Sequence, residues 1–131
     1  MEKRLYRREN VNIEGLFYIQ GAELGKIEFI GKVKNISEGG IAIEVVREED
    51  ISIADNVVFG TEIKFLYLDE YDLLEKKKSI HVEGVATVIR KEKKDNSLII
   101  GCSFRRISPE LEQYISDKKL VSFFSTGCRA L

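Results

Sequence analysis

Two short stretches of this sequence carry the residue types that could bind a flat, negatively charged molecule. The first stretch, residues 3–8, is basic and contains Arg4 and Arg8. An arginine guanidinium group is planar and forked, so it can pair with a phosphate or a guanine edge and can stack on a ring. Because the segment is too polar to form a core, we expect its side chains to be free for such contacts.

The second stretch, Asn-Ile-Ser-Glu-Gly-Gly at residues 35–40, separates two apolar strand patterns. The Asn35 amide can donate to and accept from a base edge, and the Ser37 hydroxyl suits a phosphate oxygen or a base amino group. Gly39 and Gly40 let the backbone approach a ligand closely. A solvated basic tail and an ordinary polar turn would also explain the two stretches, and this alternative stays open here.

The composition indicates one globular domain without a strong overall field. The chain has 131 residues, of which 44% are hydrophobic and 33% are charged, and its formal net charge is -1. An anion site must therefore be local, and DNA or RNA is not an expected partner. No apolar run is long enough for a membrane span or a signal peptide, and the two cysteines form no metal-binding motif. These features predict a cytoplasmic protein without a structural disulfide.

The hydrophobic pattern is dominated by strands. Segments rich in β-branched and aromatic residues, several with alternating polarity, predict strands at 10–20, 26–36, 41–46, 61–68, 79–90 and 97–107. We expect residues 47–60 to be a long connection, and the charged segment 69–78 to be a surface loop or a short helical insertion. Ser108 and Pro109 are typical of a helix start, which predicts a helix over 109–124 that stops by Gly127.

The predicted fold class is therefore all-β, with a C-terminal α-helix. Because strands do not alternate with helices, they should be mostly antiparallel and close into a small barrel or a barrel-like sandwich. We divide the chain into a flexible arginine-rich arm at 1–9 and a folded domain at 10–131.

No combination of residues predicts catalysis or a metal site. His81 lies within a predicted strand without an evident partner, and Cys102 lies in an apolar strand, where we expect it to be buried and inert. The carboxylates between Glu48 and Asp55 lack calcium-loop spacing and favour a solvated acidic loop. We expect Phe123 and Phe124 to lie in the core.

The two stretches, in this order and with these strands, resemble the PilZ domain, the bacterial receptor for cyclic di-GMP. Arg4-x-x-x-Arg8 and Asn35-x-Ser37-x-x-Gly40 match the two motifs of that family. Most of the remaining chain fits as well, including residues 84–90, residues 100–104 and the C-terminal helix. The resemblance implies a six-stranded antiparallel barrel, no catalysis and no cofactor.

The resemblance also implies a role for each motif residue. Arg4 and Arg8 would hold guanine edges and phosphates, Asn35 would read a guanine edge, Ser37 would bond the ligand, and Gly40 would leave room for it. Secondary contacts are expected from three neighbouring residues, Lys3, Arg7 and Gly39. Lys3 stands where arginine is usual, and it could help to hold a second, stacked ligand molecule.

The leading hypothesis is a cyclic di-GMP receptor whose arm becomes ordered on ligand binding and which signals to a partner protein. The expected oligomeric state is a monomer or a weak homodimer. The alternative is an adaptor of the same fold that docks partner proteins without binding the nucleotide.

Overall fold

The computed structural model describes residues 9–21 and 25–127. In chain order its elements are β1 (Glu9–Gly21), β2 (Gly25–Ser37), β3 (Gly40–Val45), α1 (Glu48–Asp55), β4 (Glu62–Leu73), β5 (Lys76–Lys93), β6 (Leu98–Ser103) and α2 (Pro109–Gly127). All six predicted strands and the C-terminal helix are present.

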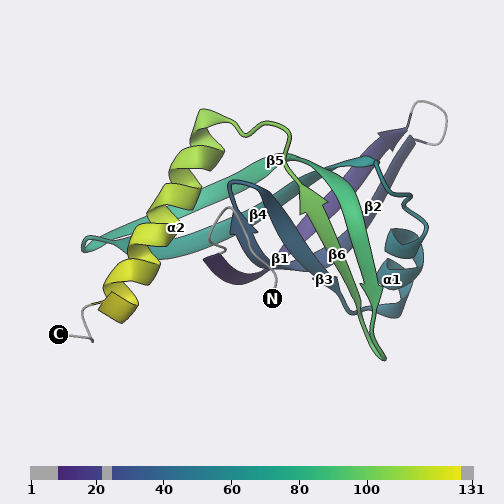
Figure 1. Ribbon diagram of the computed structural model, residues 1–131, viewed down its shortest axis with the longest axis horizontal. Coiled ribbons are helices and arrows are strands. Elements are labelled where there is room, and N and C mark those ends of the chain that lie inside the picture. Colours follow the sequence, from purple (N-terminus) through teal and green to yellow (C-terminus); the bar gives the residue numbers. More distant parts are fainter. Residues whose placement is uncertain (1–8, 22–24, 128–131) are drawn as a thin grey trace.

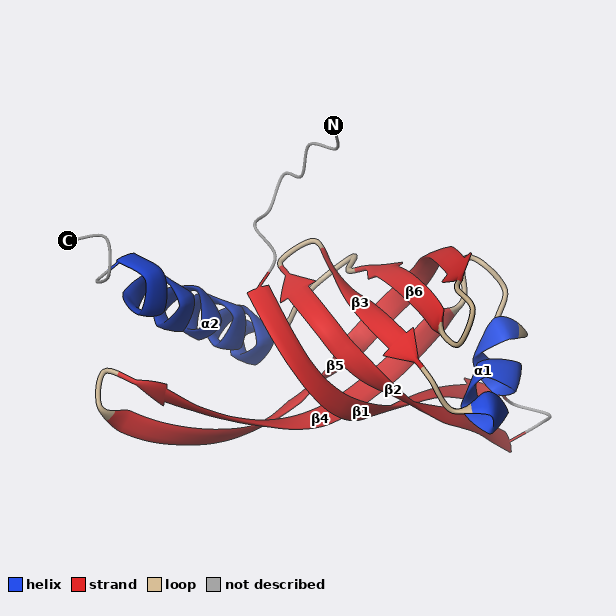
Figure 2. Cartoon of the chain, turned by 90° about the horizontal axis from the view of Figure 1, so that it is seen from below, coloured by secondary structure: helices blue, strands red, loops and turns tan. Residues whose placement is uncertain are grey.

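The strands form one sheet that closes on itself into a barrel, in the order β1-β2-β3-β6-β5-β4. Every neighbouring pair is antiparallel, which confirms the predicted fold class. A short ladder between β1 and β4, from Gly15 opposite Tyr67 to Tyr18 opposite Lys64, closes the ring. Beyond this ladder, β4 and β5 continue as a long hairpin, and α2 lies against one face of it (Figures 1 and 2).

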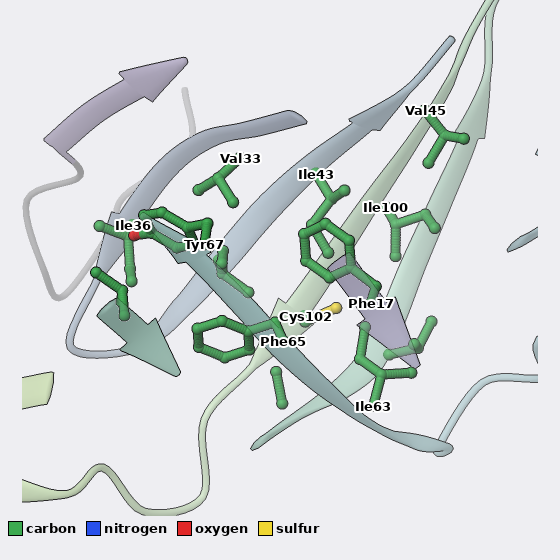
Figure 3. Packing of buried hydrophobic residues seen from close by; sticks show 14 of the residues in the cluster. Phe17, Val33, Ile36, Ile43, Val45, Ile63, Phe65, Tyr67, Ile100 and Cys102 are labelled. Carbon is green, nitrogen blue, oxygen red and sulfur yellow. The ribbon is translucent and has the colours of Figure 1, made fainter. Parts of the chain in front are cut away.

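The barrel is filled by the inward-facing side chains of all six strands. Phe17 of β1 and Phe29 of β2 stack with their ring centroids 5.5 Å apart. Figure 3 shows aliphatic side chains converging on the Phe17 ring, among them Ile43 and Ile63. Cys102 belongs to this cluster and is 5% exposed, so its predicted burial is confirmed.

The connection between β3 and β4 contains a helix that the sequence did not predict. Asp50 of α1 is buried and accepts hydrogen bonds from the Ile30 backbone N–H at 3.1 Å and from Arg47 Nε at 2.8 Å. This carboxylate fastens α1 to the middle of β2. The expectation of a solvated acidic loop was therefore wrong for Asp50, which holds two elements together.

The charged segment 69–78 had been expected to be a surface loop or a short helical insertion, and this expectation was wrong. It forms the far end of the hairpin, where β4 runs on to Leu73 and β5 begins at Lys76. Leu74 and Glu75 make the connection with φ values of 51° and 67°. Positive φ at both central residues is typical of a tight two-residue hairpin turn.

One face of this hairpin is bound to α2 by a buried polar network. Tyr67 donates a hydrogen bond to Tyr114 at 3.0 Å, and Tyr114 donates to Asp69 at 2.7 Å. Lys118 forms an ion pair with the same Asp69 oxygen at 3.0 Å. Burial raises the pKa of both tyrosines far above the ordinary value, so both hydroxyls remain protonated donors.

A second cluster forms nearer the hairpin turn, around Asp117 of α2. One oxygen of Asp117 accepts from Tyr71 and from Lys78, each at 3.0 Å, and the other accepts from Gln113 at 2.9 Å. The inward positions of the charged segment are therefore polar because they contact polar groups on α2.

The ends of α2 agree largely with the sequence. Ser108 Oγ accepts a hydrogen bond from the Leu111 N–H at 3.1 Å, which is the predicted cap, and the helix ends at the predicted stop, Gly127. The expectation that Phe123 lies in the core was wrong, because its side chain is 58% exposed. The side chain of Phe124 lies outside the described part.

Candidate functional site

The candidate site is the turn between β2 and β3, at one end of the barrel. Ser37, the last residue of β2, lies opposite Gly40, the first residue of β3. The Gly39 N–H donates to Ser37 Oγ at 3.1 Å, and the Gly39 carbonyl accepts from the Phe104 N–H at 3.0 Å. The turn is therefore fixed both by its own serine and by the segment that follows β6.

Ser37 is only 4% exposed, and its hydroxyl already accepts one backbone hydrogen bond. A serine hydroxyl can donate one proton and accept at a second lone pair, so it keeps capacity for a ligand atom. Its position indicates two duties: it shapes the turn and it presents a polar group close to the barrel end.

Gly40 is required by packing alone. A Cβ atom at this position would lie 2.1 Å from the Cys102 carbonyl oxygen, because β3 and β6 run close together here. Any side chain would push the two strands apart. This constraint exists without a ligand, so the glycine does not by itself indicate a binding site.

The ladder between β1 and β2 brings the beginning of the described chain next to this turn. Asn10 lies opposite Asn35, and Glu9 lies opposite Ile36. Glu9 belongs to β1, although the flexible arm had been expected to include it. The predicted ligand residues Lys3, Arg4, Arg7 and Arg8 lie outside the described residues. Residue 8 directly precedes Glu9 in the sequence, and Glu9 is the first residue of the strand that runs beside the turn.

The described part of the site contains two carboxylates and one lysine, Lys119, which is paired with one of them. Glu9 is 3% exposed, and Glu38 lies within the turn itself. Glu38 Oε2 pairs with Lys119 of α2, whereas Glu38 Oε1 is buried and has no hydrogen-bond partner among the described residues. An anionic ligand at this turn would therefore need further cations, because Lys119 is already paired with Glu38.

Sequence reasoning missed Glu38 and Lys119 as components of this region. The two residues lie 81 positions apart, and only the folded chain shows that α2 reaches the turn. Glu38 occupies a variable position of the expected motif, so its type alone gave no signal.

Cys102 lies on β6, opposite Ile41, which follows the turn. Burial raises the pKa of its thiol to about 12, so the thiol is protonated and unreactive at neutral pH. His81 is exposed on β5, away from the turn. Within residues 9–21 and 25–127, no three histidine, cysteine or carboxylate side chains gather as a metal site requires. In the same ranges, no helix is long and apolar enough to span a membrane.

The fold and the candidate site together define the class of this domain. It is a small closed antiparallel barrel with a C-terminal helix, and a polar turn lies at one end of the barrel. The family model for the PilZ domain matches residues 2–118. The chain belongs to the PilZ domain family.

Solved structures show the same fold at low sequence identity. The motility inhibitor MotI/DgrA of Bacillus subtilis superimposes with a TM-score of 0.56 at 19% identity, covering 94% of this chain and 50% of that one. The complex of K. pneumoniae MrkH with c-di-GMP gives a TM-score of 0.59 at 16% identity, covering 100% of this chain and 57% of that one. This chain thus spans about half the length of these two proteins. No curated protein matches the sequence.

Proposed function

We propose that this protein is a receptor for cyclic di-GMP that binds the nucleotide between its N-terminal arginines and the turn at residues 35–40. The observation that carries the proposal is the register of β1 on β2, which sets Asn10 opposite Asn35. Through this pairing, a basic segment of the right composition is joined to the chain beside the polar turn. The MrkH structure, which has the same fold, was solved as a complex with c-di-GMP.

Each predicted group has a chemical task in this proposal. Arg4 and Arg8 would neutralise the two phosphates and pair with guanine edges, as forked donors can. Asn35 would read a guanine edge, and Ser37 would donate its free proton to the ligand. The arginines would also add positive charge beside Glu38, whose nearby cation, Lys119, is already paired with it.

Signalling would follow from the arm. A ligand held on one side by residues 3–8 and on the other by the turn would fix the arm over the end of the barrel. The fixed arm would then present or hide a surface for a partner protein in the cytoplasm. No catalytic step is involved.

Isothermal titration of the folded chain with cyclic di-GMP tests the proposal directly. We expect saturable binding in the micromolar range or tighter, with GMP binding much more weakly. The absence of binding at tens of micromolar ligand would overturn the proposal.

One observation favours a second candidate, an adaptor that docks partner proteins without the nucleotide. Ser37 and Gly40 both have structural duties, and Lys119, a cation at this end of the barrel, is already paired with Glu38. An adaptor predicts partner binding that cyclic di-GMP leaves unchanged.

A further inference from the structure

The outer edge of β5 is open over about half of the strand. β5 pairs with β4 from Lys76 to Thr87, but it pairs with β6 only from Thr87 onward. In the described part of the chain, no strand lies on the other side of residues 76–86. Backbone N–H and C=O groups along such an edge can pair with another strand.

A groove runs beside the inner half of this edge. It has a volume of about 700 Å³ and is lined by Glu83, Gly84 and Val85 of β5 together with Lys64 and Phe65 of β4. Ile107 and Leu111, from the segment that enters α2, line it as well. The groove therefore adjoins the open edge at residues 83–85 and extends from there over β4.

The hairpin turn has an unusual residue at its tip. Leu74 has a φ of 51° and is 67% exposed. This backbone conformation favours asparagine, aspartate or glycine. A leucine side chain that stays exposed to water contributes no free energy of burial. A residue that departs from local preference in this way is expected where it serves a contact.

We propose that two copies of this chain associate through their β5 edges, antiparallel and about a two-fold axis at Ile80. In this register Lys77 lies opposite Glu83 of the partner subunit, and Glu83 lies opposite the partner's Lys77. Both residues are exposed and lie on the outer face of the hairpin, so each copy contributes one half of two equivalent ion pairs.

The neighbouring registers lack this complementarity. An axis at Ser79 would set Glu75 opposite Glu83 of the partner subunit, which is repulsive. An axis at His81 would set Glu83 opposite the partner's Ser79 and leave Lys77 opposite the partner's Val85. A register with its axis midway between two consecutive residues would set outer-face residues of one copy opposite inner-face residues of the other, because side chains alternate along a strand.

The same register brings the end of the partner subunit's hairpin to the part of the groove that adjoins β5. Residues 75–79 of one copy would lie along residues 81–85 of the other, which border the groove. The exposed Leu74 would lie close to Ala86 of the partner subunit, next to these residues. A single added ladder buries less surface than a standard interface, so we expect a weak dimer, with Kd on the order of tens of micromolar.

Sedimentation velocity of the full chain over a concentration series up to the millimolar range tests this proposal. We expect a reversible monomer–dimer equilibrium. Glu83→Lys and Lys77→Glu should each weaken the dimer by at least about tenfold, because attraction becomes repulsion at two equivalent positions. The double charge swap should restore the affinity.

Glu70→Lys is the matched control. Glu70 is also exposed on the outer face of the hairpin, but it lies on β4, opposite Ser79. Circular dichroism confirms that each variant is folded. A chain that is monomeric at all concentrations would overturn the proposal. The same holds for a dimer that Glu83→Lys does not weaken, for a double swap that does not restore it, or for a control that weakens it equally. None of these outcomes depends on the nucleotide.

Discussion

Lys119 of α2 forms an ion pair with Glu38, the residue at the centre of the turn between β2 and β3. The pair joins the end of the barrel to a helix that also packs against β1, β4 and β5. It also holds one oxygen of a carboxylate whose other oxygen is buried. The same contact therefore helps to hold α2 in place and lowers the net negative charge of the candidate site.

Replacing Lys119 with methionine should destabilise the fold by roughly 1 kcal/mol, because it leaves a partly buried carboxylate without its cation. Urea unfolding measures the change. Lys94→Met is the control, since Lys94 pairs with Glu92 at an exposed site, 3.9 Å apart. Equal losses in the two variants would show that the Glu38 contact contributes nothing beyond an ordinary surface pair.

Arg8→Ala and Ser37→Ala should each weaken cyclic di-GMP binding by about tenfold or more, because each removes a hydrogen bond to a charged or base-edge group. Titration calorimetry is the measurement. Arg105→Ala removes an exposed arginine near β6 and should leave the affinity unchanged. If the control variant weakens binding as much as Arg8→Ala does, the effect reflects overall charge and the site as proposed is wrong.

Gly40→Ala should lower stability by about 2–4 kcal/mol, since its Cβ would meet the Cys102 carbonyl and β3 would have to move away from β6. Gly60→Ala provides the comparison. Gly60 has a φ of 88° and nothing within 4 Å of a Cβ, so only backbone strain of about 1 kcal/mol is expected there. Thermal and urea unfolding of both variants would distinguish packing from strain, and a larger loss at Gly60 would contradict this account.

The Asp117 cluster should make stability depend on acid pH. Burial raises the pKa of this carboxyl, but the hydrogen bonds from Gln113, Lys78 and Tyr71 together outweigh it, so the pKa is lowered in the fold. A carboxyl group whose pKa is lowered by folding stabilises the fold at pH values above its pKa in the unfolded chain. This contribution is lost as the pH falls below about 4.

Asp117→Asn should therefore flatten the decline in unfolding free energy between pH 5 and pH 2, by roughly 1 kcal/mol across the window. Chemical unfolding at a series of pH values provides the measurement. Asp72→Asn, at an exposed position on the same hairpin, should leave the slope unchanged. A slope in Asp117→Asn as steep as in the unaltered chain would show that the cluster is not the acid-sensitive element.

The strand pattern could be predicted because the inward positions of the barrel are apolar. The far end of the hairpin could not, because its inward positions, including Asp69 and Lys78, are polar and are matched by groups on α2. Its turn, Leu74-Glu75, lacks the asparagine or glycine that marks a tight hairpin in sequence. Helix α1 was missed for a similar reason: a polar side chain, Asp50, attaches it to the fold by accepting a hydrogen bond from a backbone N–H on β2.

The candidate site was predictable only in part. The types and order of residues 35–40 indicated a polar turn, and the fold places that turn at the end of the barrel. The buried carboxylates and the contact with Lys119 could not be read from the sequence, because they arise when distant segments meet. The roles of Arg4 and Arg8 remain predictions, since both lie outside the described residues.

Cys102 offers a way to observe the barrel in motion. Its thiol is buried in the core of the barrel and carries almost no thiolate while the wall is closed. A disulfide reagent can react with it only when β6 separates from a neighbouring strand, β3 or β5. With Cys128 replaced by serine, the labelling rate would therefore report how often this seam opens, and whether a ligand at the adjoining turn holds it shut.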